Sequence, residues 1–233
     1  MNKTKVISPI EDNKLFFLFR RGKQEHIKAL FEDGEIYINT VDYIRYCDNN
    51  PERSDEDDGI LHRDYYGDGK ITLCDVGKDF DKDGMTMDAF NFVLKTDHKE
   101  KGNIYCLTGI YSEHLTGDRN DITFDTKSLG ESTIFIQNPK KFLERLFSAL
   151  EENGYKGSKR NKVVYYKNDY SGNVGFFLKH ERFKPQSEYR IHVPNIKDEP
   201  IKLKIGSLKD IAVFNPGSIK LIYTDGKEQL ITF

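Results

Sequence analysis

The chain has 233 residues, with 36 Lys and Arg against 38 Asp and Glu, so its formal net charge is −2. This balance argues against binding of nucleic acid through overall basicity, and the length suits one elaborated domain. Three cysteines without a Cys-x-x-Cys pair exclude a disulfide framework and a four-thiolate zinc site.

The first apolar run, Leu15 to Phe19, has five residues and is followed at once by Arg20 and Arg21. It is too short for the core of a signal peptide, and no run approaches the roughly 20 apolar residues of a membrane span. We therefore predict a cytoplasmic protein without a membrane partner. The sequence leaves the oligomeric state open.

The N-terminal part predicts alternating strands and helices. Residues 15–19 are a short apolar strand, and residues 24–31 carry apolar side chains at helical spacing, with Gly34 as the helix stop. Residues 35–40 alternate Ile with polar residues, which is typical of a strand. Residues 41–47 predict a short helix.

Residues 48–59 hold six acidic side chains and one arginine. This composition predicts a solvated loop, and the alternative is that Arg53, Asp55 and Asp58 line a pocket. Residues 60–88 contain Gly-Asp-Gly and Lys-Asp-Gly, which predict several hairpin turns.

The clearest helix is residues 139–152. Asn138 is its expected N-cap and Pro139 its first residue. Its apolar stripe is Phe142, Leu143, Leu146, Phe147 and Leu150. Further strands are predicted at 89–96, 103–110, 132–137, 162–166, 174–178, 187–193, 201–203, 211–214, 221–223 and 229–233, with a hairpin turn at Asp225-Gly226. The pattern predicts a single α+β domain over residues 1–233, with a mostly antiparallel sheet and a few helices.

Two aspartate-rich segments imitate calcium loops. Asp79 to Gly84 copies the first half of an EF-hand loop, but Phe90 stands where the closing glutamate belongs. Asp64 to Asp75 has Tyr66 at the third ligand position. Asp and Gly also gather in β-turns for reasons unrelated to metal. We predict turns here and no metal site.

The run from Tyr155 to Lys167 is basic and rich in tyrosine. Such a run could contact phosphates and stack bases, but no base-reading module accompanies it, so a solvated loop leading into a strand is the preferred interpretation. The histidines share no metal-ligand spacing, and nucleophile-elbow, Walker and dinucleotide-binding motifs are absent. Without these motifs, the commonest classes of hydrolase, nucleotidase and dehydrogenase are excluded.

The segment from Phe183 to Val193 is the most informative one for function. Polar and apolar residues alternate from Glu188 onward, as in a half-buried strand that begins after Pro185. Gln186 and Glu188 are expected on one face at the strand entry. One interpretation is an edge strand whose glutamate pairs with a neighbouring Lys or Arg. The other is a carboxylate held beside a positively charged reacting centre.

The order of these segments resembles that of uncharacterised bacterial and phage proteins thought to share the ADP-ribosyltransferase fold. The segments are Phe17-Leu18-Phe19-Arg20-Arg21-Gly22, Tyr37-Ile38-Asn39-Thr40, Cys106-Leu107-Thr108, the helix after Asn138-Pro139, Gln186-Ser187-Glu188-Tyr189-Arg190 and Ile205-Gly206-Ser207-Leu208-Lys209-Asp210-Ile211. The resemblance covers most of the chain in short pieces and implies a split sheet.

The resemblance also implies roles for particular residues. An arginine on the first strand holds the dinucleotide, and Arg20 or Arg21 matches it, since a guanidinium suits a pyrophosphate. Thr40 is the nearest match to a supporting hydroxyl, although the usual Ser-Thr-Ser triplet is absent. Glu188 would stabilise the cationic ribose as nicotinamide leaves, and Gln186 would orient the acceptor.

The implied function is ADP-ribosyl transfer from NAD, or hydrolysis of NAD, in a conflict between phage and bacterium. The acceptor would be a protein or a nucleic acid. An alternative is a catalytically silent module of the same fold that binds a nucleotide or a protein, and a third is an RNA-binding accessory protein. For an active enzyme we expect Glu188→Gln to leave folding nearly intact.

Overall fold

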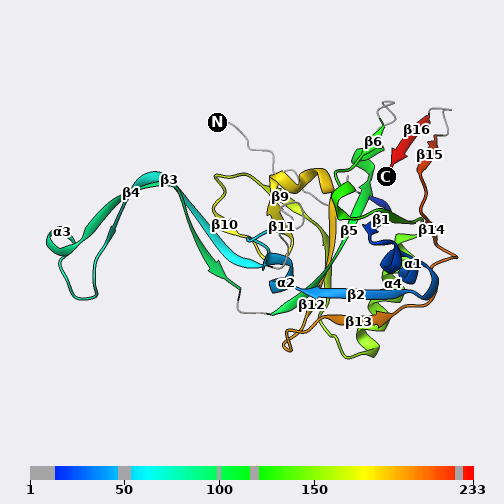
Figure 1. The fold of residues 1–233 in the computed structure, drawn as a ribbon, viewed down its shortest axis with the longest axis horizontal. Coiled ribbons are helices and arrows are strands. Elements are labelled where there is room, and N and C mark those ends of the chain that lie inside the picture. Colours follow the sequence, from blue (N-terminus) through cyan, green and yellow to red (C-terminus); the bar gives the residue numbers. More distant parts are fainter. Residues whose placement is uncertain (1–13, 47–53, 99–100, 116–120, 224–227) are drawn as a thin grey trace, which may run out of the picture.

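The computed structural model describes residues 14–46, 54–98, 101–115, 121–223 and 228–233. Cys47, Arg53 and the predicted Asp225-Gly226 turn lie outside these ranges. The described residues form an α+β domain of mostly antiparallel strands with few helices, which confirms the predicted class (Figure 1). No helix in the described ranges is both long and apolar enough to span a membrane.

The main sheet is organised around β5 (Gly102–Tyr111). One edge of β5 pairs with β12 (Glu188–Pro194) along the whole of that strand, and β8 (Lys159–Lys162) pairs with the outer edge of β12. The other edge pairs with two strands in turn. It pairs with β1 (Leu15–Gly22) and then with β2 (Glu35–Thr40). The sheet therefore divides along this edge of β5.

Each branch of the divided sheet continues outward. Next to β1 lie β7 (Ser132–Ile136) and then β14 (Ala212–Phe214). Next to β2 lies β13 (Ile201–Lys204). All of these pairings are antiparallel.

One face of the sheet packs against α1 (Gln24–Asp33) and α4 (Pro139–Glu152). The predicted capping of α4 is confirmed, because the Asn138 side chain accepts a hydrogen bond of 3.0 Å from the Lys141 amide. Its stripe is buried except for partly exposed Phe147. The strand residues in this core include Leu18, Ile134, Ile136, Leu107, Tyr189, Ile191 and Val193. Each such side chain contributes about 1.5–3 kcal/mol on burial.

An aromatic cluster covers the other face near β1. Phe19 lies 5.2 Å from Phe124 and 5.0 Å from Phe233, measured between ring centroids. A three-stranded sheet contributes to this cluster. Its strands are β15 (Ser218–Ile222), β16 (Glu228–Thr232) and β6 (Ile122–Thr123).

The shorter elements surround the division of the sheet. They are α2 (Val41–Tyr46), the 3₁₀ turns η1 (Ser112–His114), η2 (Lys127–Leu129) and η3 (Glu181–Gln186), and the parallel pair β9 (Val164–Tyr166) and β11 (Leu178–His180). The prediction of a strand at 174–178 is wrong for most of its length. Phe176 instead turns inward, with its ring stacked 3.8 Å from that of His192 and its carbonyl accepting from Arg190.

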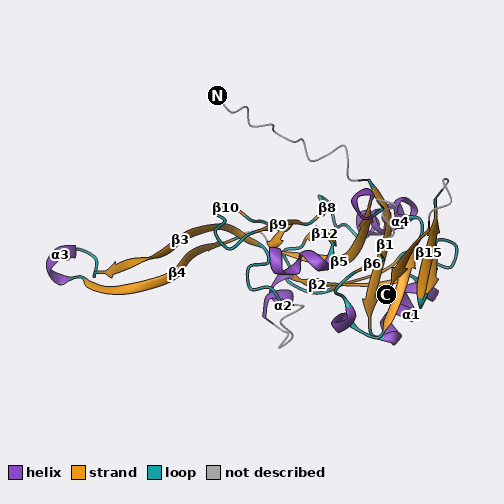
Figure 2. Cartoon of the chain, turned by 90° about the horizontal axis from the view of Figure 1, so that it is seen from above, coloured by secondary structure: helices purple, strands orange, loops and turns teal. Residues whose placement is uncertain are grey.

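A long hairpin projects from the body (Figure 2). It consists of β3 (Ile60–Leu73) and β4 (Met85–Asp97), with α3 (Phe80–Asp83) at the tip and β10 (Gly172–Asn173) beside its base. The prediction of several hairpins over residues 60–88 is wrong, because there is one hairpin, but the predicted Lys-Asp-Gly turn does lie at its tip. Gly67 and Gly69 accompany register shifts inside the paired strands, and Gly67 adopts a φ of 70°, so the chain does not reverse there.

Candidate functional site

A cleft opens where the sheet divides. β1 pairs with residues 108–111 of β5, whereas β2 pairs with Asn103 and Ile104. Between these stretches the carbonyl of Cys106 accepts a hydrogen bond from the Arg20 guanidinium instead of from a strand. The cleft, called the split cleft below, has a volume of about 140 Å³ and an open mouth. It is lined by Arg20, Arg21, Tyr37, Asn39, Ile44, Ile104, Cys106, Leu107, Thr108, Leu129, Lys179, Gln186, Glu188 and Arg190.

Both predicted arginines of β1 line the split cleft, but their surroundings differ. The Arg20 guanidinium lies 4.3 Å from the centroid of the Tyr105 ring, in addition to its bond with Cys106. Arg21 donates from Nε to the Gly130 carbonyl at 2.6 Å. Its Nη1 is buried and has no hydrogen-bond partner among the described residues. An unpaired buried donor is costly, so Arg21 is the better candidate to bind a ligand oxygen.

The predicted role of Thr40 is not supported by its position. Thr40 is not among the residues that line the cleft. Its hydroxyl oxygen accepts from the Tyr43 amide at 3.1 Å, which caps the start of α2. β2 instead presents Tyr37 and Asn39, two lining residues that were not predicted from the sequence. Their alternation with buried Ile36 and Ile38 was the available signal, because it placed them on the face opposite the core.

Gln186 and Glu188 both line the split cleft, although Gln186 belongs to η3 and not to the strand. Ser187 between them adopts the left-handed conformation with φ 46°, which is uncommon outside glycine. Its hydroxyl donates to the Gly109 carbonyl at 2.9 Å, and the Gly109 amide donates back to the Ser187 carbonyl at 2.8 Å. These bonds hold the strained residue and set the entry into β12.

Glu188 is 5% exposed and is paired with two cations. Its carboxylate lies 2.9 Å from Arg190 Nε and 3.1 Å from Lys179 Nζ. The predicted pairing with a neighbouring Lys or Arg is therefore present, but β12 is an interior strand and not an edge. Burial alone would raise the pKa of Glu188, but the charges of Arg190 and Lys179 hold it below its ordinary value.

Arg190 connects Glu188 to the acidic loop at residues 54–59, because it pairs with Glu188 and with Asp58. Its Nη1 and Nη2 donate to the two carboxylate oxygens of Asp58 at 2.5 and 3.0 Å, and both side chains are fully buried. Burial would lower the pKa of Arg190, but the Asp58 and Glu188 carboxylates raise it well above its ordinary value. In the same way they keep Lys179 protonated, with a pKa above its ordinary value despite burial.

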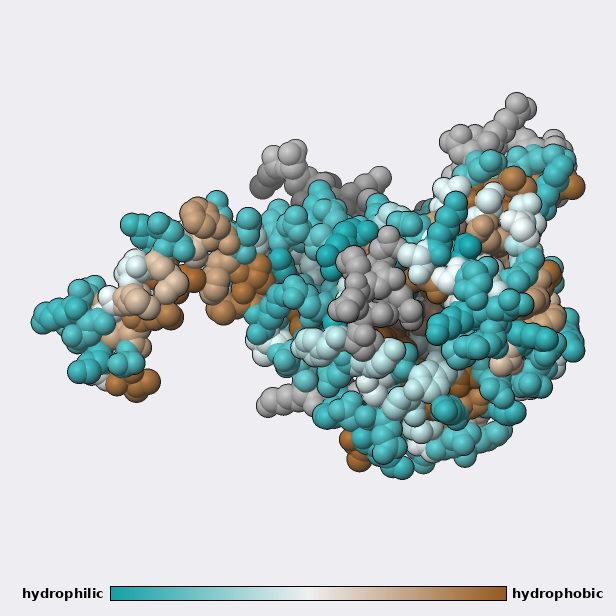
Figure 3. Space-filling model, in the orientation of Figure 1, coloured by the Kyte–Doolittle hydropathy of each residue, from teal (hydrophilic) through white to brown (hydrophobic). Residues whose placement is uncertain are grey.

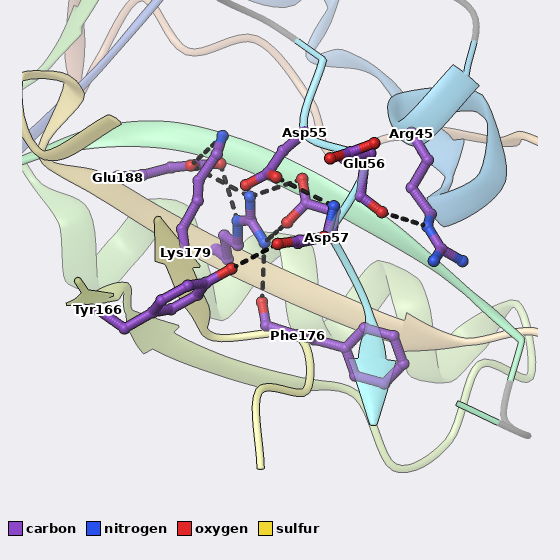
Figure 4. Close-up of polar contacts among 10 residues, drawn as sticks. Arg45, Asp55, Glu56, Asp57, Tyr166, Phe176, Lys179 and Glu188 are labelled. Atoms are coloured by element: carbon purple, nitrogen blue, oxygen red, sulfur yellow. Dashed lines mark hydrogen bonds and ion pairs between the residues drawn. The ribbon is translucent and has the colours of Figure 1, made fainter. Parts of the chain in front are cut away.

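The prediction of a simple solvated loop at residues 48–59 is wrong for its described part. Asp55 and Asp58 are 2% and 0% exposed. Asp57 accepts a hydrogen bond of 3.0 Å from the Tyr166 hydroxyl, which attaches the loop to β9 (Figure 4). Burial, together with the Asp58 carboxylate, raises the pKa of Asp55 to about 6. The loop is acidic because it compensates buried cations behind the cleft.

The charged side chains that line the cleft are four basic residues and one acidic residue. Asp58 offsets Arg190 from behind, so the lining retains a positive excess. Such a lining attracts an anionic ligand. Cys106 adds no thiolate nucleophile, because burial raises the pKa of its thiol above the ordinary value.

The remaining motifs have structural roles. Asp79 caps α3 by accepting from the Asp81 amide at 3.0 Å, and Asp64 to Asp75 mostly follows β3. Among the described residues, no group of three or more His, Cys, Asp and Glu side chains is arranged to hold a metal ion. Tyr166 is buried, and the Tyr165 hydroxyl accepts from the Glu188 amide at 2.8 Å. These two tyrosines therefore support the cleft and do not form an exposed platform for bases.

Comparison of the chain with models of protein families, with curated proteins and with solved structures gives no match.

Proposed function

We propose that the split cleft binds NAD and promotes cleavage of its nicotinamide–ribose bond, with ADP-ribose passing to an acceptor or to water. The observation that carries this proposal is that Arg20, Arg21, Gln186 and Glu188 line one cleft. These residues come from two motifs near opposite ends of the chain. Their convergence at a division of the sheet is what the resemblance to ADP-ribosyltransferases implied.

The proposed roles follow from charge. Arg20 and Arg21, which both line the cleft, bind the pyrophosphate through their guanidinium groups. Glu188 faces the ribose and stabilises the positive charge that develops at its C1′. The bond between C1′ and the pyridinium nitrogen breaks, and its electron pair leaves with neutral nicotinamide. The acceptor then bonds to C1′ and gives up its proton, while Gln186 orients it.

The size of the cleft limits how NAD would bind. Its volume of about 140 Å³ is close to that of an engineered cavity that holds one benzene ring, about 150 Å³. Ligand pockets for drug-sized molecules measure roughly 300–1,000 Å³. The cleft therefore has room for about one ring, such as nicotinamide, and the ribose, pyrophosphate and adenosine would extend through the open mouth.

A second candidate is a silent module that binds a nucleotide without turnover. The observation in its favour is the pairing of Glu188 with Arg190 and Lys179, which already compensates the charge that the reaction needs. We place the enzyme first because Oε1 of Glu188 can accept a ribose hydroxyl beside Arg190 Nε, although Oε2 already accepts from Lys179 and from Arg190 Nη2. A protein or nucleic-acid acceptor and a role in phage–bacterium conflict are extensions of this proposal.

The test is incubation of the purified protein with NAD labelled on its adenine, with and without cell lysate. Free labelled ADP-ribose and nicotinamide would demonstrate hydrolysis, and label on a macromolecule would demonstrate transfer. Calorimetric binding of NAD without release of nicotinamide would favour the silent module. Failure to bind NAD would reject the enzyme and would leave the silent module with a different nucleotide. For substitutions of the cleft arginines, Arg145→Ala is the matched control, because Arg145 lies on α4 and does not line the cleft.

A further inference from the structure

Tyr37 is the only aromatic residue among the described residues that line the split cleft. It lies on β2, where it alternates with buried Ile36 and Ile38, so its side chain is on the sheet face opposite α1 and α4. The residue is 45% exposed, which places it at the mouth of the cleft and not in its interior. An aromatic ring at this position offers a flat surface on which a base can stack.

Lys202 on β13 is the neighbour of Tyr37. The two residues pair directly across antiparallel β2 and β13, which lie side by side in Figure 1, and residues paired in this way share a face. The Lys202 ammonium lies 5.5 Å from the centroid of the Tyr37 ring. Lys204, the next residue on this face, is paired with Glu35 at 3.0 Å, whereas Lys202 forms no ion pair with a carboxylate of the described residues. Tyr37 and Lys202 are together called the β2–β13 shelf.

The distance between the shelf and Glu188 determines which part of a ligand the shelf can reach. β2 and β12 pair with opposite edges of β5. Neighbouring strands are about 4.8 Å apart, so β2 and β12 are separated by about 10 Å. Tyr37 lies beyond the residues of β2 that pair with β5, at the division of the sheet. A group stacked on Tyr37 is therefore roughly 10 Å or more from Glu188.

This separation suits a dinucleotide. In NAD, two riboses and a pyrophosphate separate the nicotinamide from the adenine, and the split cleft has room for about one ring. With the nicotinamide in the cleft, the remainder of NAD leaves through the mouth, where the shelf lies. On the side drawn in Figure 3 the body is mainly hydrophilic, and hydrophobic residues gather along the projecting hairpin. A hydrophilic surface suits a small charged ligand better than an apolar protein partner.

We infer that the β2–β13 shelf binds the adenosine end of NAD, with the adenine stacked on Tyr37 and the Lys202 ammonium beside the adenosine phosphate. This inference rests on the proposed function of the split cleft. Stacking of a base on an aromatic ring strengthens binding roughly 5- to 150-fold, whereas an exposed contact of a cation with a ring contributes roughly 2- to 5-fold. The adenine therefore displaces the ammonium from the ring, and the ammonium is then available to the phosphate.

Calorimetric titration with three ligands tests this inference. They are NAD, ADP, which lacks the nicotinamide and its ribose, and nicotinamide mononucleotide, which lacks the adenosine end. Tyr37→Ala should weaken binding of NAD and ADP roughly 5- to 150-fold and should leave binding of the mononucleotide within about twofold of the wild type. Tyr37→Phe keeps the ring and should bind all three ligands as the wild type does. The matched control is Tyr43→Ala, because Tyr43 is 47% exposed on α2 and does not line the cleft.

Melting temperatures establish that each variant is folded. Equal losses for NAD and the mononucleotide in Tyr37→Ala, no loss for NAD, or an equal loss for NAD in Tyr43→Ala would overturn the inference. Release of nicotinamide by the wild type separates this inference from the proposed function. ADP binding that depends on Tyr37, in a protein that releases no nicotinamide, would support the shelf and reject the enzyme. Nicotinamide release with an NAD affinity that does not depend on Tyr37 would do the reverse, and binding of none of the three ligands would reject both.

Discussion

Arg190 and Asp58 form a fully buried bidentate ion pair with N–O distances of 2.5 and 3.0 Å. The pair joins an interior strand to a loop near the N-terminal third of the chain. Because Arg190 also contacts Glu188 at 2.9 Å, the loop fixes the orientation of the carboxylate that lines the split cleft. The folding of the loop and the geometry of the candidate site are therefore coupled.

Asp58→Asn should destabilise the protein by about 3–5 kcal/mol, since it leaves the Arg190 charge buried without its bidentate partner. Urea unfolding measures the loss. The matched control is Asp210→Asn. Asp210 binds Arg145 through the same two-pronged geometry, at 3.1 and 2.7 Å, but on the surface. That variant should lose much less stability, and equal losses would contradict the importance of burial.

Asp55→Asn should stabilise the protein, and the gain should depend on pH. The folded state raises the pKa of Asp55 from 3.8 to about 6, so it binds the proton more tightly than the unfolded state does. The contribution of Asp55 to the free energy of unfolding of the wild type therefore falls as pH rises from about 4 to 6, and it stays reduced at higher pH. Asparagine carries no charge, so it removes the free-energy cost of burying the ionised carboxylate, which is roughly 2–3 kcal/mol for about two pKa units.

Melting temperatures of wild type and Asp55→Asn between pH 4 and pH 8 check this prediction. The difference should be largest at pH 7–8 and should vanish toward pH 4. The control is Glu56→Gln, because Glu56 is adjacent in sequence but exposed. A stabilisation of Asp55→Asn that is equal at every pH would show that the charge is not its cause.

Arg21→Ala should weaken NAD binding by roughly 10- to 150-fold, because a hydrogen bond to a charged group contributes about 1.5–3 kcal/mol. Calorimetry with NAD measures this change. Arg20→Ala should also lower the melting temperature, since Arg20 already bonds the Cys106 carbonyl and lies over the Tyr105 ring. An Arg21→Ala variant that binds NAD as tightly as the wild type would remove Arg21 from the proposed site.

Local patterns in the sequence predicted the elements that carry the site. Alternation identified the strand at 188–193, and the Asn138 cap with its apolar stripe identified α4. These features depend on neighbours a few residues apart, so a linear pattern contains them. The same alternation on β2 contained Tyr37 and Asn39, which the family resemblance led us to pass over in favour of Thr40.

The buried charges could not be predicted in this way. Asp55 and Asp58 have the composition of a solvated loop, but Asp58 is buried in its ion pair with Arg190, far along the chain, and Asp55 lies buried beside it. Acidic side chains are rarely buried unless they are paired, and sequence alone does not identify the partner. The long hairpin was not predicted, because a glycine can mark either a turn or a register shift inside a strand, and Gly67 and Gly69 mark register shifts.

The expectation that Glu188→Gln leaves folding nearly intact has to be revised. This substitution leaves Lys179 and Arg190 buried with one negative partner fewer, so the single variant should be destabilised. A loss of activity in that variant would not separate catalysis from unfolding. Lys179→Met combined with Glu188→Gln removes one charge of each sign and keeps the buried cluster balanced.

The most direct test of the account is therefore the rate of nicotinamide release from NAD by the Lys179→Met single variant and by the double variant. Glu144→Gln on the exposed face of α4 is the control, and melting temperatures establish that all variants are folded at the assay temperature. We predict that the double variant is at least ~10²-fold slower than Lys179→Met, because only it lacks the carboxylate that faces the cationic ribose. Equal rates in the two folded variants would contradict the assignment of Glu188 as the catalytic residue.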